Sequence, residues 1–471
     1  MNQISLFDGN EQFKINKPIR LIELFGGYGS QSLALKYLGL NFEHWKLSEW
    51  AVPSIQAYKD LHFGEDDTNY SEGLSQEEIV NFLEGKISSD YSTPMTREQI
   101  QRKGESWQRK VYNNMLASHN LGSITQIKSK QLQITDTDKY CYIMTYSFPC
   151  QDLSSSGTLG GMAKGSGTRS GLLWEVERLL DECEELPQVV LMENVPEIIG
   201  SRNIKHFAKW VEKLESLGYK CKWNCLNAKN YAIPQNRDRC FMVSVLGDYY
   251  YEMPNETPLD LTLNDLLEDE VDEKYYLSDT QLNYVLDGND VALSSGRNIN
   301  NHIVNPQIAK TISCRGAIDQ RADVTNFVVG NNEKQYTVRE IKDIINLRSK
   351  NKHLKKIIEK IDTTETLALD TYNQTVHKDF VQTIKANINT RNEDYLWKDL
   401  RIRKFIENEC WRLMGVKNED YEKVAKNQTK GSMYHLAGDS IVTTCLMAII
   451  GNMLQIDYLD KIQTLLKEIK K

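Results

Sequence analysis

Residues 19–39 read IRLIELFGGYGSQSLALKYLG, and this stretch decides the fold class. Residues 19–25 are apolar enough for a buried strand, the glycines that follow make a tight turn, and residues 32–38 begin a helix that stops at Gly39. A second strand is expected to end at residues 47–49, which completes a strand–helix–strand unit. The pattern predicts an α/β fold, whose site lies where the strands end.

An insertion is expected to interrupt this alternation over residues 60–120. Two helix starts are signalled inside it, at Ser75 and Thr96, because each is followed three residues later by Glu or Gln, the pattern of a capping box. Strands and helices then alternate again until about residue 250, where the regular rhythm stops. No internal repeat is visible.

The chain is long enough for more than one domain. Its 471 residues indicate two or three compact units. We expect a catalytic domain over residues 1–252, a second domain over residues 253–429, and a C-terminal segment over residues 430–471 that returns to the first. The second domain is expected to be irregular, because its strand-like pieces are short.

Composition limits the classes of function. The formal net charge of −8 is unusual for a protein that binds nucleic acid, so any such binding needs locally concentrated Lys and Arg. Nine cysteines, an odd number, argue against a disulfide framework and for a reducing cytosol. Cys221 and Cys225 have no matching second pair, so we expect no metal site. Without a signal peptide or an apolar run of about 18 residues, we expect a cytoplasmic protein and no membrane contact.

Reactive side chains follow several predicted strands. The apolar run at residues 142–146 is followed by Pro149, which ends the strand and brings Cys150 to the edge where α/β folds build their sites. Cys150 is therefore a candidate nucleophile. Glu193 follows the apolar run at residues 189–192 in the same way.

Four segments occur in a characteristic order: FGGYG at 25–29, PCQ at 149–151, ENV at 193–195 and QNRDR at 235–239. Together they resemble the ordered motifs of the cytosine-specific C5 DNA methyltransferases. The resemblance implies a Rossmann-like large domain that binds S-adenosylmethionine, with a smaller, irregular target-recognition domain. It implies methyl transfer to C5 of a flipped-out cytosine in a specific sequence of double-stranded DNA.

The resemblance also implies which residues hold the cofactor. Phe25 would stack on the adenine, while Glu49 at the end of the second strand would accept hydrogen bonds from both ribose hydroxyls. Asp439 stands where the family usually has Asn, and the segment around Ser123 corresponds to the adenine-contacting motif. The full implied cofactor set is Phe25, Gly27, Gly29, Ser30, Glu49, Trp50, Pro149, Leu172, Asp439 and Ser440.

Cytosine C5 is a poor nucleophile, which explains the need for reactive groups at the strand ends. A thiolate from Cys150 that adds to C6 would make C5 able to attack the methyl group. A proton donor at N3 lowers the barrier, and the resemblance gives this role to Glu193. Arg237 and Arg239 alternate along a predicted strand and so face the same side. By resemblance Arg239 bonds the cytosine O2 and Arg237 helps to hold the catalytic loop.

A stacked base is out of reach of these groups, so the target nucleotide must be flipped out. The polar, glycine-rich run after Cys150 suits a mobile loop that closes over DNA. The expected DNA contacts are Gln151, Ser154, Ser156, Gln235 and Arg315. Residues 253–400 carry further basic side chains for reading sequence and contacting phosphate, namely Arg321, Arg348, Lys350, Lys352, Lys355 and Lys356.

Three other functions stay open. An RNA-methylating branch of the family is disfavoured because its recognition region is shorter. A dinucleotide-dependent oxidoreductase would leave Cys150, Glu193 and Arg239 without a purpose. A catalytically silent DNA-binding regulator is disfavoured because all three positions hold reactive side chains. We expect a monomer that serves in restriction-modification or phage protection near the nucleoid, with a cognate endonuclease acting separately where one exists.

Overall fold

The structure is a computed structural model that describes residues 11–149, 153, 161–165, 168–278, 303–304, 306–313, 328–329, 336–337 and 402–470. The chain divides into two compact units. The first comprises residues 1–266, 313–315 and 407–471, and the second comprises residues 267–312 and 316–406.

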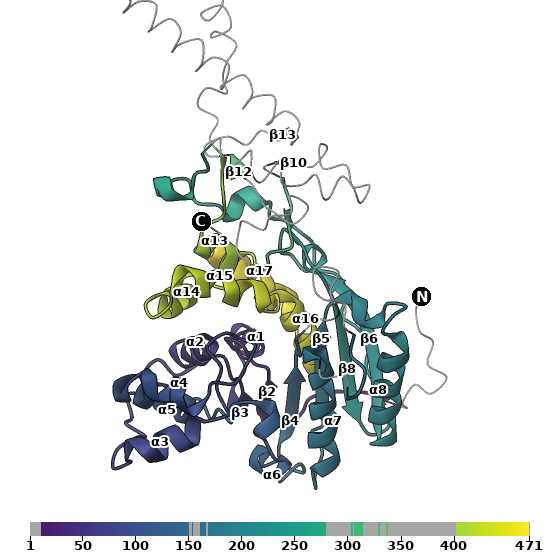
Figure 1. Cartoon of the computed structure of the whole chain (residues 1–471). Coiled ribbons are helices and arrows are strands. Elements are labelled where there is room, and N and C mark those ends of the chain that lie inside the picture. The colour runs from purple at the N-terminus through teal and green to yellow at the C-terminus, as the bar shows by residue number, and fades with distance from the viewer. Residues whose placement is uncertain are drawn as a thin grey trace, which may run out of the picture. The chain divides into compact units, whose positions relative to one another are not determined.

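A six-stranded sheet forms the centre of the first unit, in the order β3-β2-β4-β5-β8-β6 (Figure 1). Its strands are β2 (Ile19–Leu24), β3 (Phe42–Ser48), β4 (Cys141–Tyr146), β5 (Val189–Asn194), β6 (Tyr219–Asn227) and β8 (Asp238–Leu246). Strands β3, β2, β4 and β5 are parallel, whereas β8 runs antiparallel to both of its neighbours. Strands β4 and β5 are buried along their whole length, as expected for strands covered on both faces. The predicted α/β fold class is confirmed.

Helices α7 (Leu173–Glu182) and α8 (Ile204–Ser216) share a hydrophobic core with the central strands. Trp210 from α8 is fully buried in this core, and its indole Nε1 donates to Tyr146 Oη at the end of β4 (2.8 Å). Helix α1 (Ser30–Tyr37) packs instead against α16 (Thr443–Leu454) from the far end of the chain. The C-terminal segment therefore completes the first unit.

The insertion forms a small helical subdomain next to α2 (Val52–His62). Its helices are α3 (Gln76–Leu83), α4 (Arg97–Arg102) and α5 (Glu105–Ala117), packed around a separate core that includes Ile79 and Met115. Helices α3 and α4 begin with complete capping boxes at Ser75 and Thr96. Both predicted helix starts are confirmed.

The bounds of the two units differ from the expected limits of 253 and 429. Residues 407–429, with helices α13 (Glu407–Arg412) and α14 (Asn418–Ala425), pack inside the first unit. The reason is burial of large side chains: Trp411 stacks on Tyr28 at 4.6 Å between ring centroids, and Arg412 Nη1 donates to the Leu266 carbonyl (3.0 Å). In the described part of the second unit, β10 (Ile303–Val304) pairs with β13 (Tyr336–Thr337), and β12 (Val328–Val329) pairs with β14 (Ile402–Arg403).

One helical stretch of the described chain, Lys430–Leu454, has the length and hydropathy of a membrane-spanning helix. It contains α15 (Lys430–Asp439) and α16, and its most apolar window is 83% buried inside the protein. The sequence did not predict this run. Burial accounts for it, because a helix enclosed by its neighbours is apolar on every side.

Candidate active site

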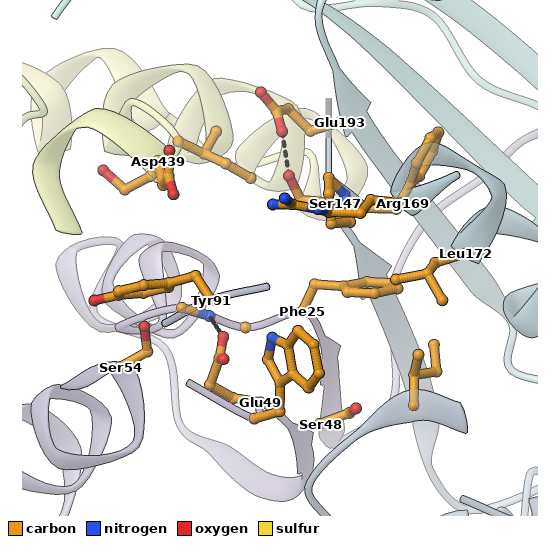
Figure 2. A pocket seen from close by; sticks show the side chains of 18 of the residues that line it. Phe25, Ser48, Glu49, Ser54, Tyr91, Ser147, Arg169, Leu172, Glu193 and Asp439 are labelled. Carbon is orange, nitrogen blue, oxygen red and sulfur yellow. Dashed lines mark hydrogen bonds between the residues drawn. The ribbon is translucent and has the colours of Figure 1, made fainter. Parts of the chain in front are cut away.

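A cavity of about 470 Å³ lies where the parallel strands end (Figure 2). Its walls come from the chain after β2, β3, β4 and β5 and from residues 435–441. The sequence-predicted residues that line it are Phe25, Gly27, Ser30, Glu49, Trp50, Pro149, Leu172, Glu193, Arg237, Arg239, Asp439 and Ser440. The structure thus brings together residues more than 400 positions apart in the chain.

The glycine turn after β2 has two positions with different roles. Gly27 and Gly29 both have positive φ, at 56° and 86°, a region that favours glycine. A Cβ on Gly27 would meet no atom within 4 Å, so its backbone is open to the cavity, which it lines. A Cβ on Gly29 would lie 2.4 Å from His62 Nε2. Gly29 is not among the described residues that line the cavity and packs closely at the start of α1, and its expected cofactor contact stays a prediction.

Glu49 is held by backbone amides at one side of the cavity. Its Oε2 accepts from Gly27 N (2.8 Å) and its Oε1 accepts from Ala51 N (2.7 Å), and Figure 2 shows the first of these bonds. Burial raises the pKa of Glu49 to about 7. Because a carboxylate oxygen has two lone pairs, each can still accept a hydrogen bond from a ligand.

Glu193 lies at another side of the cavity, at the end of β5. Arg239 Nε lies 3.0 Å from Glu193 Oε1, and Ser147 Oγ donates to Glu193 Oε2 (Figure 2). The neighbouring Asn194 donates through Nδ2 to the Phe148 carbonyl (2.9 Å). These bonds tie the end of β5 to the segment after β4.

The segment after β4 is also bonded to Ser170, in addition to its bonds with the end of β5. Ser170 Oγ donates to the Pro149 carbonyl (2.7 Å), and Pro149 lines the cavity. Cys150 is the next residue in the sequence. The predicted site residues Cys150, Gln151, Ser154, Ser156 and Arg315 lie outside the described residues, as do the six further basic positions of residues 321–356.

Arg237 and Gln235 connect the site to the C-terminal part of the chain. Arg237 is buried, and its Nη2 donates to the carbonyls of Gly438 and Ser440 (both 2.8 Å). Arg237 is expected from the sequence to help to hold the catalytic loop. In the structure Arg237 binds the C-terminal segment. Gln235 is fully buried, and its Nε2 donates to the Leu413 carbonyl (2.7 Å). Gln235 thus ties its own segment to the chain near Leu413, and its expected DNA contact stays a prediction.

Some cavity residues were not predicted from the sequence. Tyr91, Ser92 and Pro94 come from the insertion, and His435 comes from α15. One local signal was Asp90, since an Asp side chain that accepts from the backbone two residues later closes a turn. Ser123 also lines the cavity, beside Ile124. Among the described residues, no cluster of three or more His, Cys, Asp or Glu side chains could hold a metal ion.

Comparison with known proteins identifies the family. The model of the C-5 cytosine-specific DNA methylases matches residues 99–455. The chain belongs to this family. It is therefore a DNA (cytosine-5-)-methyltransferase, as the resemblance predicted.

Two relatives illustrate the match in sequence. The orphan methyltransferase M.SssI of Spiroplasma monobiae is 37% identical over 266 residues, which cover 56% of this chain and 68% of the relative. The type II methyltransferase M2.ScrFI of Lactococcus lactis subsp. cremoris is 36% identical over 267 residues, which cover 56% of this chain and 71% of the relative.

Solved structures of other methyltransferases share the fold. The S. pombe Dnmt2 methyltransferase matches with a TM-score of 0.52 at 16% identity, over 93% of this chain and 98% of that one. The Entamoeba histolytica methyltransferase EhMeth matches with a TM-score of 0.54 at 13% identity, over 93% and 99%. At 16% and 13% identity, these two structures show only that this chain shares their fold.

Proposed function

We propose that the protein transfers a methyl group from S-adenosylmethionine to C5 of a cytosine flipped out of double-stranded DNA, through a covalent bond between Cys150 and C6. One observation carries the proposal. A single cavity is lined both by Glu49 and by the Glu193–Arg239 pair. A methyl donor and an acceptor base bound there would meet inside one enclosed space.

The cavity residues fit S-adenosylmethionine. The wall offers an aromatic ring in Phe25, an open backbone at Gly27 and carboxylates in Glu49 and Asp439. The cofactor supplies a methyl group on a positively charged sulfur, and it carries an ammonium group at its amino-acid end. Acidic residues in the wall favour such a cation. Glu49 accepts hydrogen bonds from the ribose hydroxyls, and Phe25 stacks on the adenine.

The reaction needs three residues near the base. The Cys150 thiolate would form a bond to C6 while Glu193 gives a proton to N3, so that C5 becomes nucleophilic. C5 would then bond to the methyl carbon as the bond between that carbon and the cofactor sulfur breaks, and S-adenosylhomocysteine would be the leaving group. Arg239 binds the cytosine O2 and, through its 3.0 Å contact, fixes the direction of the Glu193 carboxyl. Loss of the C5 proton to a base would then allow the bond between Cys150 Sγ and C6 to break while N3 returns its proton to Glu193, which releases methylated cytosine and free thiolate.

Sequence recognition belongs in this proposal to the second domain expected over residues 253–429, of which residues 253–266, 313–315 and 407–429 belong to the first compact unit. Arg315 would read a base edge, while Gln151, Ser154 and Ser156 would contact DNA near the flipped base. We further propose that the enzyme acts as a monomer in the cytoplasm, close to the nucleoid. Its relatives bear the names of type II and orphan methyltransferases, which supports a role in restriction-modification or phage protection, with any cognate endonuclease acting separately.

Methyl transfer from tritium-labelled S-adenosylmethionine to double-stranded DNA and to RNA tests the proposal. We expect label in DNA at C5 of cytosine within one sequence context. Label in RNA alone would favour the RNA-methylating alternative. DNA binding without any transfer would favour the silent regulator.

A further inference from the structure

The insertion contributes a loop to the wall of the cofactor cavity. Tyr91, Ser92 and Pro94 line the cavity, although the insertion contains none of the four motifs that identify the family. The loop lies within the same compact unit as the rest of the cavity. Figure 2 shows Tyr91 and Asp439 across the cavity from Leu172.

Hydrogen bonds fix this loop to the chain that follows Glu49. Ser88 N donates to the Trp50 carbonyl (2.7 Å), and Val52 N donates to the Ser88 carbonyl (2.9 Å). Within the loop, Asp90 Oδ1 accepts from the backbone amides of the two residues after Tyr91 (both 2.8 Å). These amides lower the pKa of Asp90 to about 2, so the turn is closed by an ionised side chain.

Tyr91 has an uncommon backbone conformation for a large residue. Its φ is +59°, in the left-handed region that costs non-glycine residues energy. Such conformations persist only where the surroundings impose them, and they concentrate at functional sites. Here the Asp90 turn imposes the conformation, and the result is a tyrosine side chain in the cavity wall.

The Tyr91 ring is connected to the Asp439 carboxylate through the side chain of His435. It stacks on the His435 imidazole at 3.8 Å between ring centroids and 29° between planes. His435 Nε2 lies 2.9 Å from Asp439 Oδ2, within ion-pair distance. All three side chains line the cavity, and the imidazole links the Tyr91 ring to a carboxylate of the wall.

Asp439 is the carboxylate best placed to meet a positive group of the ligand. In the proposed complex the free lone pairs of Glu49 accept from the ribose hydroxyls, and Glu193 is paired with Arg239. The Asp439 side chain is 51% exposed beside its imidazole partner. An Asp carboxylate at this place in the wall suits an ammonium group.

We propose that Tyr91 is a positioning residue which, through His435, orients Asp439 toward the ammonium group at the amino-acid end of the cofactor. The insertion thus has a function in cofactor binding. This inference depends on the proposed use of S-adenosylmethionine.

Two ligands separate this effect from a general loss of structure. S-adenosylhomocysteine has the amino-acid end, whereas 5′-methylthioadenosine lacks it and keeps the adenosine part. We expect Tyr91→Ala to weaken S-adenosylhomocysteine at least tenfold by calorimetry, and 5′-methylthioadenosine less than twofold. Tyr91→Phe keeps the ring and should stay within twofold of the wild type for both ligands. Tyr70→Ala, an exposed tyrosine of the same insertion, is the matched control and should change neither.

Further variants keep the test decisive if Tyr91→Ala unfolds. Asp439→Asn should weaken the binding of S-adenosylhomocysteine but not that of 5′-methylthioadenosine. Tyr91→Leu removes the ring, and its combination with His435→Ala should bind S-adenosylhomocysteine no more weakly than His435→Ala alone. Equal losses for both ligands, or no loss for either, would overturn the proposed positioning role. A wild-type protein that binds neither ligand would instead contradict the proposed cofactor.

Discussion

Single residues decide how the two substrates would be held. Glu49 and Glu193 are both buried carboxyls at strand ends, yet their partners differ. Glu49 accepts from two backbone amides, whereas Glu193 contacts the side chains of Arg239 and Ser147. The first arrangement provides a fixed acceptor, and the second a carboxyl whose position depends on neighbouring side chains.

Cofactor binding should depend on the charge of Glu49. Its pKa is raised to about 7, so it is protonated in the free enzyme below that pH and ionised above it. Ribose hydroxyls donate best to the ionised form, so affinity for S-adenosylhomocysteine should rise as the pH increases through about 7. Calorimetry between about pH 5.5 and about pH 8.5, which is roughly one and a half units on each side of that pKa, checks this. Glu49→Gln should bind more weakly and show a flatter profile; an unchanged profile would mean that another group titrates.

Cys150→Ser should abolish methylation while cofactor binding survives, because an alcohol is far less ionised than a thiol. We expect a loss of roughly 10³-fold or more in transfer rate. DNA with fluorine at C5 of the target should trap the wild-type enzyme in a complex that resists denaturation, but should not trap the variant. Turnover by the variant, or the lack of a wild-type adduct, would argue against the covalent route.

At the scale of elements, the turn between β2 and α1 requires glycine for two separate reasons. Gly29→Ala should cost about 2 kcal/mol or more of unfolding free energy, because its Cβ combines a positive φ with a clash against His62. Gly27→Ala is the matched control, with a positive φ but free space, and should cost about 1 kcal/mol. Urea unfolding measures both. Equal costs would show that the clash relaxes at little expense.

The local sequence pattern predicted most helices and strands near the site, but it did not predict the contacts between residues that are far apart in the chain. The β2–α1–β3 unit, the capping boxes at Ser75 and Thr96 and the strands before Pro149 and Glu193 follow from periodicity and turn chemistry. The burial of Gln235 did not follow, because its carbonyl partner is 178 residues away. Tyr91 was missed for the same reason, since its role depends on a histidine in α15.

At the scale of the whole molecule, the bounds of the two units show where a segment can be exchanged between relatives. These bounds are narrower than the range of residues 253–429 expected from the sequence. Replacing residues 267–406 by the counterpart of a relative should move the methylated site without destroying the chemistry, because Trp411 and Arg412 stay with the first unit. Replacing residues 253–429 should also remove the stack on Tyr28 and so lower stability. Base-resolution mapping of methylcytosine and thermal unfolding check the two chimeras. Methylation of the original site by the first chimera would place recognition elsewhere, most plausibly in the insertion at residues 60–120.

The contacts of Tyr28 have a consequence for synthesis of the protein. Its ring stacks on Trp411, and its Oη donates to Ser440 Oγ (3.0 Å), a partner 412 residues later. Ribosomes add ~5–20 residues per second, so about 20–80 s pass between synthesis of Tyr28 and synthesis of these partners. Long-range contacts of this kind also slow folding. A chain released before Trp411 would lack residues 435–441, which form one wall of the cavity, so methylation becomes possible only after these residues have been synthesised.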